Sequence, residues 1–239
     1  MRDFADITIV LDRSGSMNSL VGDVIGGYKT FIEKQKAVGD NAAVTLVQFD
    51  DQYEKVFTGV PIKNVSADLA FNPRGMTALL DAMGRTIDAT GERLRNLPES
   101  QRPDKVIFVV ITDGEENASR EYRIERLREL VTRQQNQYNW QFIFLGANID
   151  SFATGASLGI SSFTTSNYVG TGVGIRSALY AAGTYTCSVR EQGVSHASMS
   201  DTYAKAQADL EAEKNANTAF LNGTTSTGVK SGFTIGGTV

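Results

Sequence analysis

Four apolar segments rich in β-branched residues alternate along this chain with segments of helical periodicity, and this alternation restricts the fold more than any other feature. Three of the four segments have too little polar alternation for a strand with one wet face, so we expect strands covered on both sides. Strands that alternate with helices predict a mainly parallel sheet. The expected strands span residues 6–11, 43–49, 105–111 and 140–145.

The intervening segments carry apolar residues at helical spacing, most clearly at 21–32, 80–94 and 124–131. Residues 53–58 follow the second strand too closely for a crossover helix, so we expect an antiparallel edge strand there. A last edge strand is expected at 160–165. The predicted fold class is α/β: a doubly wound, mainly parallel, Rossmann-like sheet of order 3-2-1-4-5-6, with one antiparallel edge strand and helices on both faces.

The last quarter of the chain differs in composition from the rest. We expect a compact domain over residues 1–190 and a C-terminal extension over 191–239, with a polar helix at about 200–221. The Gly-, Thr- and Ser-rich end lacks the apolar content to order itself and is expected to be flexible. The Gly-rich stretch 170–174 lacks the spacing of a dinucleotide fingerprint and is interpreted as a flexible connection.

Charge and cysteine content exclude several classes of function. The chain of 239 residues has a net charge of −4 and no basic stripe, so we expect no nucleic acid partner. It shows no signal-like N-terminus and no apolar run long enough for a membrane, which predicts a cytoplasmic location. The single cysteine, Cys187, is expected to pack, and the single histidine, His196, to have no ligand role.

Carboxylates and hydroxyls follow two of the predicted strands. Asp12, Ser14 and Ser16 come directly after the first strand, and Asp113 follows the strand at 105–111. If these strands are neighbours, the four side chains meet at the carboxyl edge of the sheet, where such folds bind ligands. The two carboxylates would repel each other unless a cation lay between them.

The chemistry of these candidate ligands favours a hard ion. All of them are oxygens, which predicts Mg²⁺ or Mn²⁺ rather than zinc or copper. Thr77 opens the helix at 80–94 and could either cap it or reach the ion. Taken alone, Asp12, Ser14 and Ser16 could equally cap the first helix.

The three motifs together resemble the metal-ion-dependent adhesion site of von Willebrand factor A domains. They are "DRSGSM" after the first strand, "GMTALLDAM" before a helix and "VVITDGEEN" at the end of a later strand. The resemblance covers residues 3–190 and is greatest to the intracellular bacterial and phage branch. It implies that Ser14 and Ser16 bind the ion directly, that Asp12 and Asp113 act directly or through water, and that Thr77 joins in one of two states.

The resemblance implies a binding module without enzymatic activity, which captures an Asp or Glu of a partner protein at the metal. The C-terminal extension would add a second contact or self-association. An alternative is a Mg²⁺-dependent phosphatase of the haloacid-dehalogenase type with Asp12 as nucleophile, but Ser14 stands where that mechanism needs a general acid. RNA binding, as in A domains beside RNA-binding modules, finds no support in the charge balance.

Five other polar residues lie in the same predicted loops. Arg13 and Arg74 could attract an acidic partner or be ordinary surface charges. Glu115, Glu116 and Asn117 are expected to be solvated rather than to bind the ion.

Overall fold

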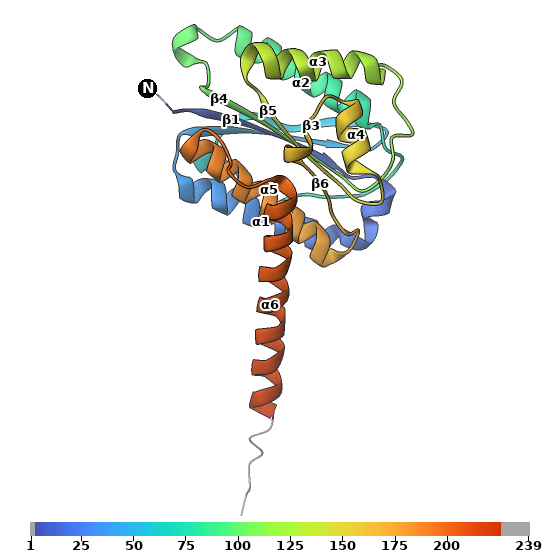
Figure 1. Cartoon of the computed structure of the whole chain (residues 1–239), viewed down its shortest axis with the longest axis vertical. Helices are drawn as coiled ribbons and strands as arrows, with labels where there is room; N and C mark the ends of the chain where they lie inside the picture. Colours follow the sequence, from blue (N-terminus) through green and yellow to red (C-terminus); the bar gives the residue numbers. More distant parts are fainter. Residues whose placement is uncertain (1–2, 226–239) are drawn as a thin grey trace, which may run out of the picture.

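The strands form a single sheet whose order, β3-β2-β1-β4-β5-β6, is the predicted one (Figure 1). The computed structural model describes residues 3–225. Neighbouring strands are parallel except β2 and β3, which confirms the antiparallel edge strand. The strands are β1 (Ala5–Asp12), β2 (Ala42–Phe49), β3 (Tyr53–Pro61), β4 (Lys105–Thr112), β5 (Gln141–Gly146) and β6 (Thr165–Asn167).

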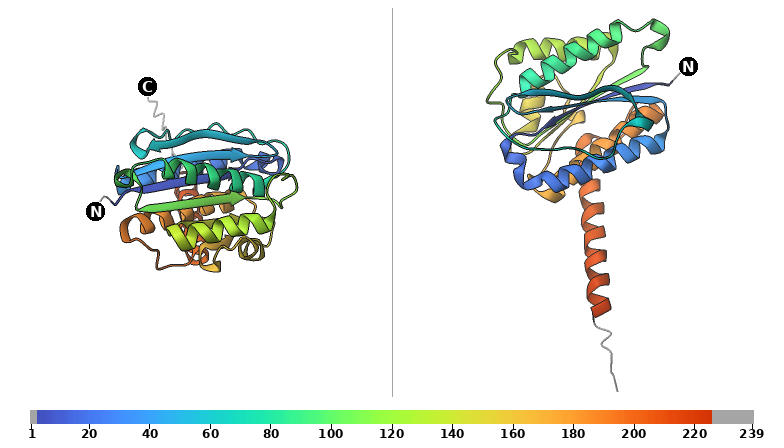
Figure 2. Two further views of the ribbon diagram at one scale, coloured as in Figure 1. Left: turned by 90° about the horizontal axis from the view of Figure 1, so that it is seen from above. Right: turned by 180° about the vertical axis from the view of Figure 1, so that it is seen from behind.

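Helices cover both faces of this sheet, as the uniformly apolar strands predicted (Figure 2). Every residue of β1 and β2 is buried, because neither face of these strands meets water. The helices are α1 (Val21–Val38), α2 (Leu79–Arg95), α3 (Ile124–Tyr138), α4 (Ser151–Ser157), α5 (Gly172–Gln192) and α6 (Met199–Thr225), with short 3₁₀ helices at Gly15–Leu20, Ile62–Asn64, Glu99–Gln101 and Ser162–Thr164.

Side-chain alternation along the strands divides the core into two layers. Ile7, Ile9 and Leu11 of β1 pack toward α1 and α5, whereas Val10 packs toward α2 and α3. The helices α1 and α5 approach closely, since a Cβ on Gly27 would lie 2.6 Å from Leu179 Cδ1. A larger residue at position 27 would push these helices apart.

Two details of the C-terminal half differ from the prediction. The last strand lies at Thr165–Asn167 rather than at 160–165, because residues 162–164 form a 3₁₀ turn held by bonds to Ser161. The stretch 170–174 is not only a connection: Gly172 begins α5, capped by the hydroxyl of Thr171, which accepts a bond from the Gly174 N–H. The polar cap residue next to the glycines was the signal for this helix start.

The helix α6 packs on the domain only through its first turns. Met199, Tyr203 and Ala206 are buried there, and Tyr203 Oη accepts a hydrogen bond from the Val169 N–H. Beyond these residues α6 projects away from the body (Figure 1). The predicted flexible end of the chain, from residue 226, lies outside the described residues. Within residues 3–225, no helix has both the length and the apolarity needed to cross a membrane.

Candidate metal centre at the carboxyl edge of the sheet

Asp12 is the last residue of β1 and is fully buried. One carboxylate oxygen, Oδ1, accepts a bond of 2.7 Å from the Ser14 N–H, and Oδ2 accepts one of 2.7 Å from Thr112 Oγ1. The first bond folds the chain back so that Ser14 stays beside the strand end. No side-chain cap bond forms at Ser14, so the alternative in which this motif caps the following helix gains no support.

The two serine hydroxyls and the second aspartate form one chain of contacts. Ser14 Oγ lies 3.0 Å from Ser16 Oγ, and Ser16 Oγ donates to Asp113 Oδ1. Asp113 comes directly after β4, and β4 pairs with β1, so the two strand ends lie side by side. Its N–H lies 3.4 Å from Asp12 Oδ2. Four of the five predicted residues therefore meet at one place.

Thr77, in the loop before α2, lies close to the same residues. A Cβ on Gly114 would lie 3.5 Å from Thr77 Oγ1 and 4.0 Å from Ser16 Oγ, so the two hydroxyls flank the Gly114 backbone. The Thr77 N–H donates to Asn117 Oδ1 at 2.9 Å. The helix α2 begins at Leu79 after Ala78, without a side-chain cap. Of the two predicted roles of Thr77, the structure excludes the cap.

Burial makes the carboxylates at this site unusually basic. Desolvation raises the pKa of Asp12 from 3.8 to about 6, against the hydrogen bonds from Thr112 and Ser14, and the nearby Asp113 raises it further. Burial also raises the pKa of Asp113. Within residues 3–225, neither carboxylate pairs with a cationic side chain. The two charges therefore lack a compensating positive charge from the protein.

The arginines near the site do not supply that charge. Arg13 is buried and binds Asp50 at 2.9 Å and also Glu54. Arg74 binds the same oxygen of Asp50 at 2.9 Å. The suggestion that Arg13 and Arg74 attract a partner or are ordinary surface charges is wrong for Arg13, which is buried against Asp50; the Arg74 side chain stays 53% exposed while it binds Asp50.

Sequence reasoning missed how the loop after β4 is held. The Glu116 carboxylate accepts bonds from the N–H groups of Leu80, Ala118 and Ser119 and from the Ser119 hydroxyl, at 2.7–2.9 Å. The expectation that Glu116 is merely solvated is therefore wrong. Its bonds fasten the 114–119 segment to the start of α2.

A second carboxylate completes this attachment. Asp81, in the first turn of α2, accepts bonds from the N–H groups of Arg120, Glu121 and Tyr122 at 2.8–2.9 Å. Although burial raises the pKa of Asp81, these three bonds lower it below 3.8 overall. An aspartate on the buried side of a helix, two residues after Leu79, was the only sequence signal for this role.

The donor set suits a hard divalent ion. The five candidate ligands are three hydroxyls and two carboxylates, all oxygens, and Mg²⁺ and Mn²⁺ prefer such ligands. In the part of the chain that the structure describes, no group of three or more His, Cys, Asp or Glu side chains is arranged for a metal. Any ion here would therefore depend on the hydroxyls as much as on Asp12 and Asp113.

The family model of the von Willebrand factor type A domain matches residues 6–158, which is more than half of the chain. The chain belongs to the von Willebrand factor type A family. The match includes all five predicted site residues of this VWA domain. No curated protein matches the chain.

Solved structures of low sequence identity share the VWA fold. Manganese-loaded TRAP protein of Plasmodium vivax is 14% identical, with a TM-score of 0.53 over 70% of this chain and 68% of TRAP. The VWA domain of SpRpn10 is 14% identical, with a TM-score of 0.51 over 74% of this chain and 94% of that domain. Proximal thread matrix protein 1 from the mussel byssus is 16% identical, with a TM-score of 0.52 over 77% of this chain, which spans only 46% of that protein.

Proposed function

We propose that this VWA domain binds another protein by holding a divalent cation, Mg²⁺ or Mn²⁺, that accepts an Asp or Glu side chain of the partner. The proposed metal ligands are Asp12, Ser14, Ser16, Thr77 and Asp113. The observation that carries the proposal is the pair of adjacent, buried carboxylates without a cationic partner among the described residues. The manganese-loaded TRAP structure supports a divalent ion in this family.

The residues of the chain would each have a distinct part in this function. Asp12 and Asp113 supply two negative charges, which match one divalent cation, so an incoming acid meets no net negative charge at the ligand set. Ser14, Ser16 and Thr77 supply neutral oxygens, which leave the cation able to accept a further carboxylate. When bound, the cation supplies the Lewis acidity that attracts the partner's acid.

The phosphatase alternative gains no support from the geometry. A nucleophilic aspartate needs an open oxygen, whereas Asp12 is fully buried and both of its oxygens accept hydrogen bonds. We therefore propose a binding module rather than an enzyme. The cytoplasmic location, the bacterial or phage origin and the self-association through the extension remain predictions.

Calorimetric titration of the metal-free protein with Mg²⁺ or Mn²⁺ tests the metal site. We expect one site in the wild type and none in Asp12→Ala. Asp68→Ala is a matched control, because Asp68 is exposed and lies outside the site. Equal binding by the wild type and Asp12→Ala would overturn the assignment.

Partner capture needs its own experiment, an affinity pull-down from the native host with Mg²⁺ or with EDTA. We expect a complex that EDTA releases and that the double variant Ser14→Ala/Ser16→Ala does not form. Substitution of one Asp or Glu on the identified partner should abolish the same complex. A complex that survives EDTA would show that the site does not hold the partner.

A further inference from the structure

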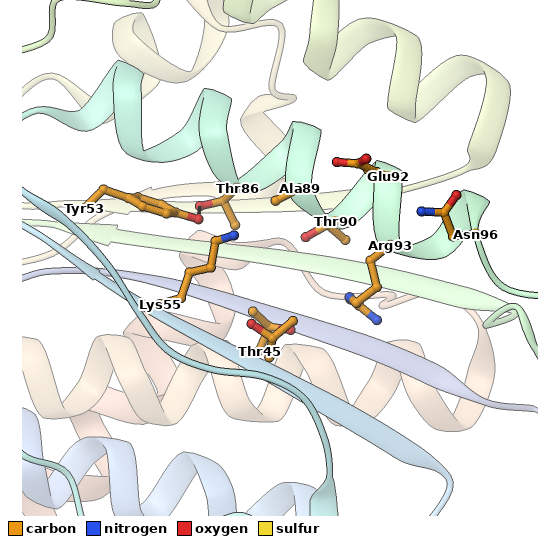
Figure 3. Close-up of a pocket in the computed structure, with 10 residues that line it drawn as sticks. Thr45, Tyr53, Lys55, Thr86, Ala89, Thr90, Glu92, Arg93 and Asn96 are labelled. Atoms are coloured by element: carbon orange, nitrogen blue, oxygen red, sulfur yellow. Dashed lines mark hydrogen bonds between the residues drawn. The ribbon is translucent and has the colours of Figure 1, made fainter.

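A hollow of about 280 Å³ lies far from the metal centre, between the second half of α2 and the strands β2 and β3 (Figure 3). Thr45 of β2 forms its floor, Lys55 and Thr58 of β3 one side, and Thr90 and Arg93 of α2 the other. This volume is many times the roughly 30 Å³ that a water molecule occupies in the liquid. The hollow thus has room for a small organic molecule.

The sheet carries buried polar residues at and beside the floor of this hollow: Thr45 lines it, and Asp6 and Thr8 lie next to it on β1. Asp6, Thr8 and Thr45 are all at least 97% buried, whereas the opposite face of the same strands is apolar except for Gln48. Thr8 and Thr45 are register partners on β1 and β2. Buried polar groups are costly without partners, so this concentration of them needs a reason other than stability.

The hollow offers more hydrogen-bond donors than the protein uses. Thr45 Oγ1 accepts from the Gly59 N–H at 3.0 Å, which leaves its own proton free to donate. Arg93 gives one N–H to Asp6 Oδ1 at 2.8 Å, and its buried Nε has no partner among the described residues. Lys55 forms no ion pair within residues 3–225 and points toward the hollow (Figure 3).

Acceptors are scarce in the same place. The Asp6 carboxylate is already bound to Arg93, and the Glu92 carboxylate points away from the Arg93 guanidinium (Figure 3). Thr86 Oγ1 lies 2.6 Å from the Ala82 carbonyl and 3.1 Å from Tyr53 Oη, so it is satisfied within the protein. With Glu92 counted, the charges around the hollow balance, but Arg93 is paired with Asp6 and Lys55 forms no ion pair within residues 3–225. The missing component is a negatively charged group with several acceptor oxygens.

We propose that this hollow binds the phosphate group of a small phosphorylated molecule between Lys55 and Arg93. The donors come from β2, β3 and α2 and so surround a point rather than lie in one plane, which suits a tetrahedral phosphate better than a flat carboxylate. Thr45 and Thr90 donate to the phosphate oxygens, and the remaining volume holds the organic part. This binding site is independent of the metal centre.

Inorganic phosphate is the first probe, titrated into ¹⁵N-labelled full-length protein at constant ionic strength without divalent ions. We expect saturable amide shifts at Thr45, Thr58 and Thr90. Lys55→Gln should weaken phosphate binding about tenfold or more, and Thr90→Val about fivefold, since charged and neutral hydrogen bonds differ in strength. Lys63→Gln, at another exposed lysine, should bind as the wild type does.

Lys55 is exposed and unpaired among the described residues, so its substitution leaves the fold intact, and an unchanged melting temperature checks this. Equal phosphate affinity in Lys55→Gln and the wild type would overturn the proposal, as would acetate binding as tightly as phosphate. Glycerol 3-phosphate should bind more tightly than a phosphoserine peptide. The reverse order would contradict a small-molecule ligand.

Discussion

The two ends of α2 lie against opposite kinds of chemistry. Before its first turn stand Thr77 and the carboxylates Asp12 and Asp113, an acidic group that lacks a cation. Beside its last turns stand Arg93, which is paired with Asp6, and Lys55, which forms no ion pair within residues 3–225. The first end lacks positive charge, and at the second Lys55 lacks a negatively charged partner among the described residues. The helix therefore separates two candidate binding sites whose ligands must have opposite charge.

The largest change in stability should come from Mg²⁺ binding at the acidic end. Mg²⁺ at about 100 times its Kd should raise the free energy of unfolding of the wild type by about 2.7 kcal/mol, because it binds only the folded protein. Thermal unfolding with and without Mg²⁺ measures this as a rise of several degrees. Asp12→Ala should show no rise. If phosphate and Mg²⁺ together gave less than the sum of their separate effects, the two ends would not be independent.

The next effect concerns the loop that joins the acidic end to α2. Asp81→Asn replaces one carboxylate oxygen, which accepts a backbone N–H, with an NH₂ group that cannot accept it. We therefore expect the free energy of unfolding in chemical denaturation to fall by about 1.5–3 kcal/mol. Because the folded-state pKa of Asp81 is lowered, its stabilisation is present above 3.8 and lost as the pH falls through the lowered value. Wild type and variant should therefore converge in acid. A constant difference down to about pH 2 would contradict this account.

The sequence predicted which residues meet at the acidic end and gave no indication of the cationic end. Asp12, Ser14 and Ser16 are adjacent in the chain, and the strand alternation was enough to place Asp113 beside them. The hollow is built from single residues on β2, β3 and α2, and Thr45 and Arg93 become neighbours only through packing. Helical and strand periodicity report which face a residue occupies, but not whether the facing side chains fill the space.

The same limit explains the smaller errors at the candidate metal centre. Nothing near Arg13 in the sequence pairs with it, so the sequence suggests a surface or partner-binding charge. Its partner, Asp50, comes from the loop after β2. Charged loops are usually solvated, yet the carboxylate of Glu116 faces α2 residues that come more than thirty positions earlier. Long-range ion pairs and loop attachments of this kind leave no local pattern.

A third effect tests the loop geometry at the acidic end. Gly75 has φ +65°, and its carbonyl accepts a bond of 3.2 Å from the Gly15 N–H between the serine positions. Gly75→Ala should cost about 1–2 kcal/mol, because a side chain disfavours this backbone conformation and its Cβ would meet Asp51 Oδ1. Equilibrium unfolding and Mg²⁺ titration should both show the loss.

Gly26→Ala is the matched control for that substitution. Gly26 lies inside α1, and a Cβ added there would have no neighbour within 4 Å among the described residues. Alanine should therefore stabilise the helix by about 0.5–1 kcal/mol and leave Mg²⁺ binding unchanged. If Gly75→Ala behaved like Gly26→Ala, the turn at Gly75 would have no part in holding the serine loop.

The smallest effect should come from the cationic end and have the opposite sign. The hydroxyl of Thr8 is fully buried and has no hydrogen-bond partner in the described part of the chain, although its register partner Thr45 lines the hollow. Thr8→Val keeps the shape and removes the unsatisfied oxygen, so chemical denaturation should show a gain of about 1 kcal/mol. Phosphate binding should stay unchanged, because Thr8 does not line the hollow. A loss of stability instead would mean that the Thr8 hydroxyl forms a hydrogen bond in solution. Thr8 of β1 would then belong, with Thr45, to the hydrogen-bonded polar residues beside the hollow.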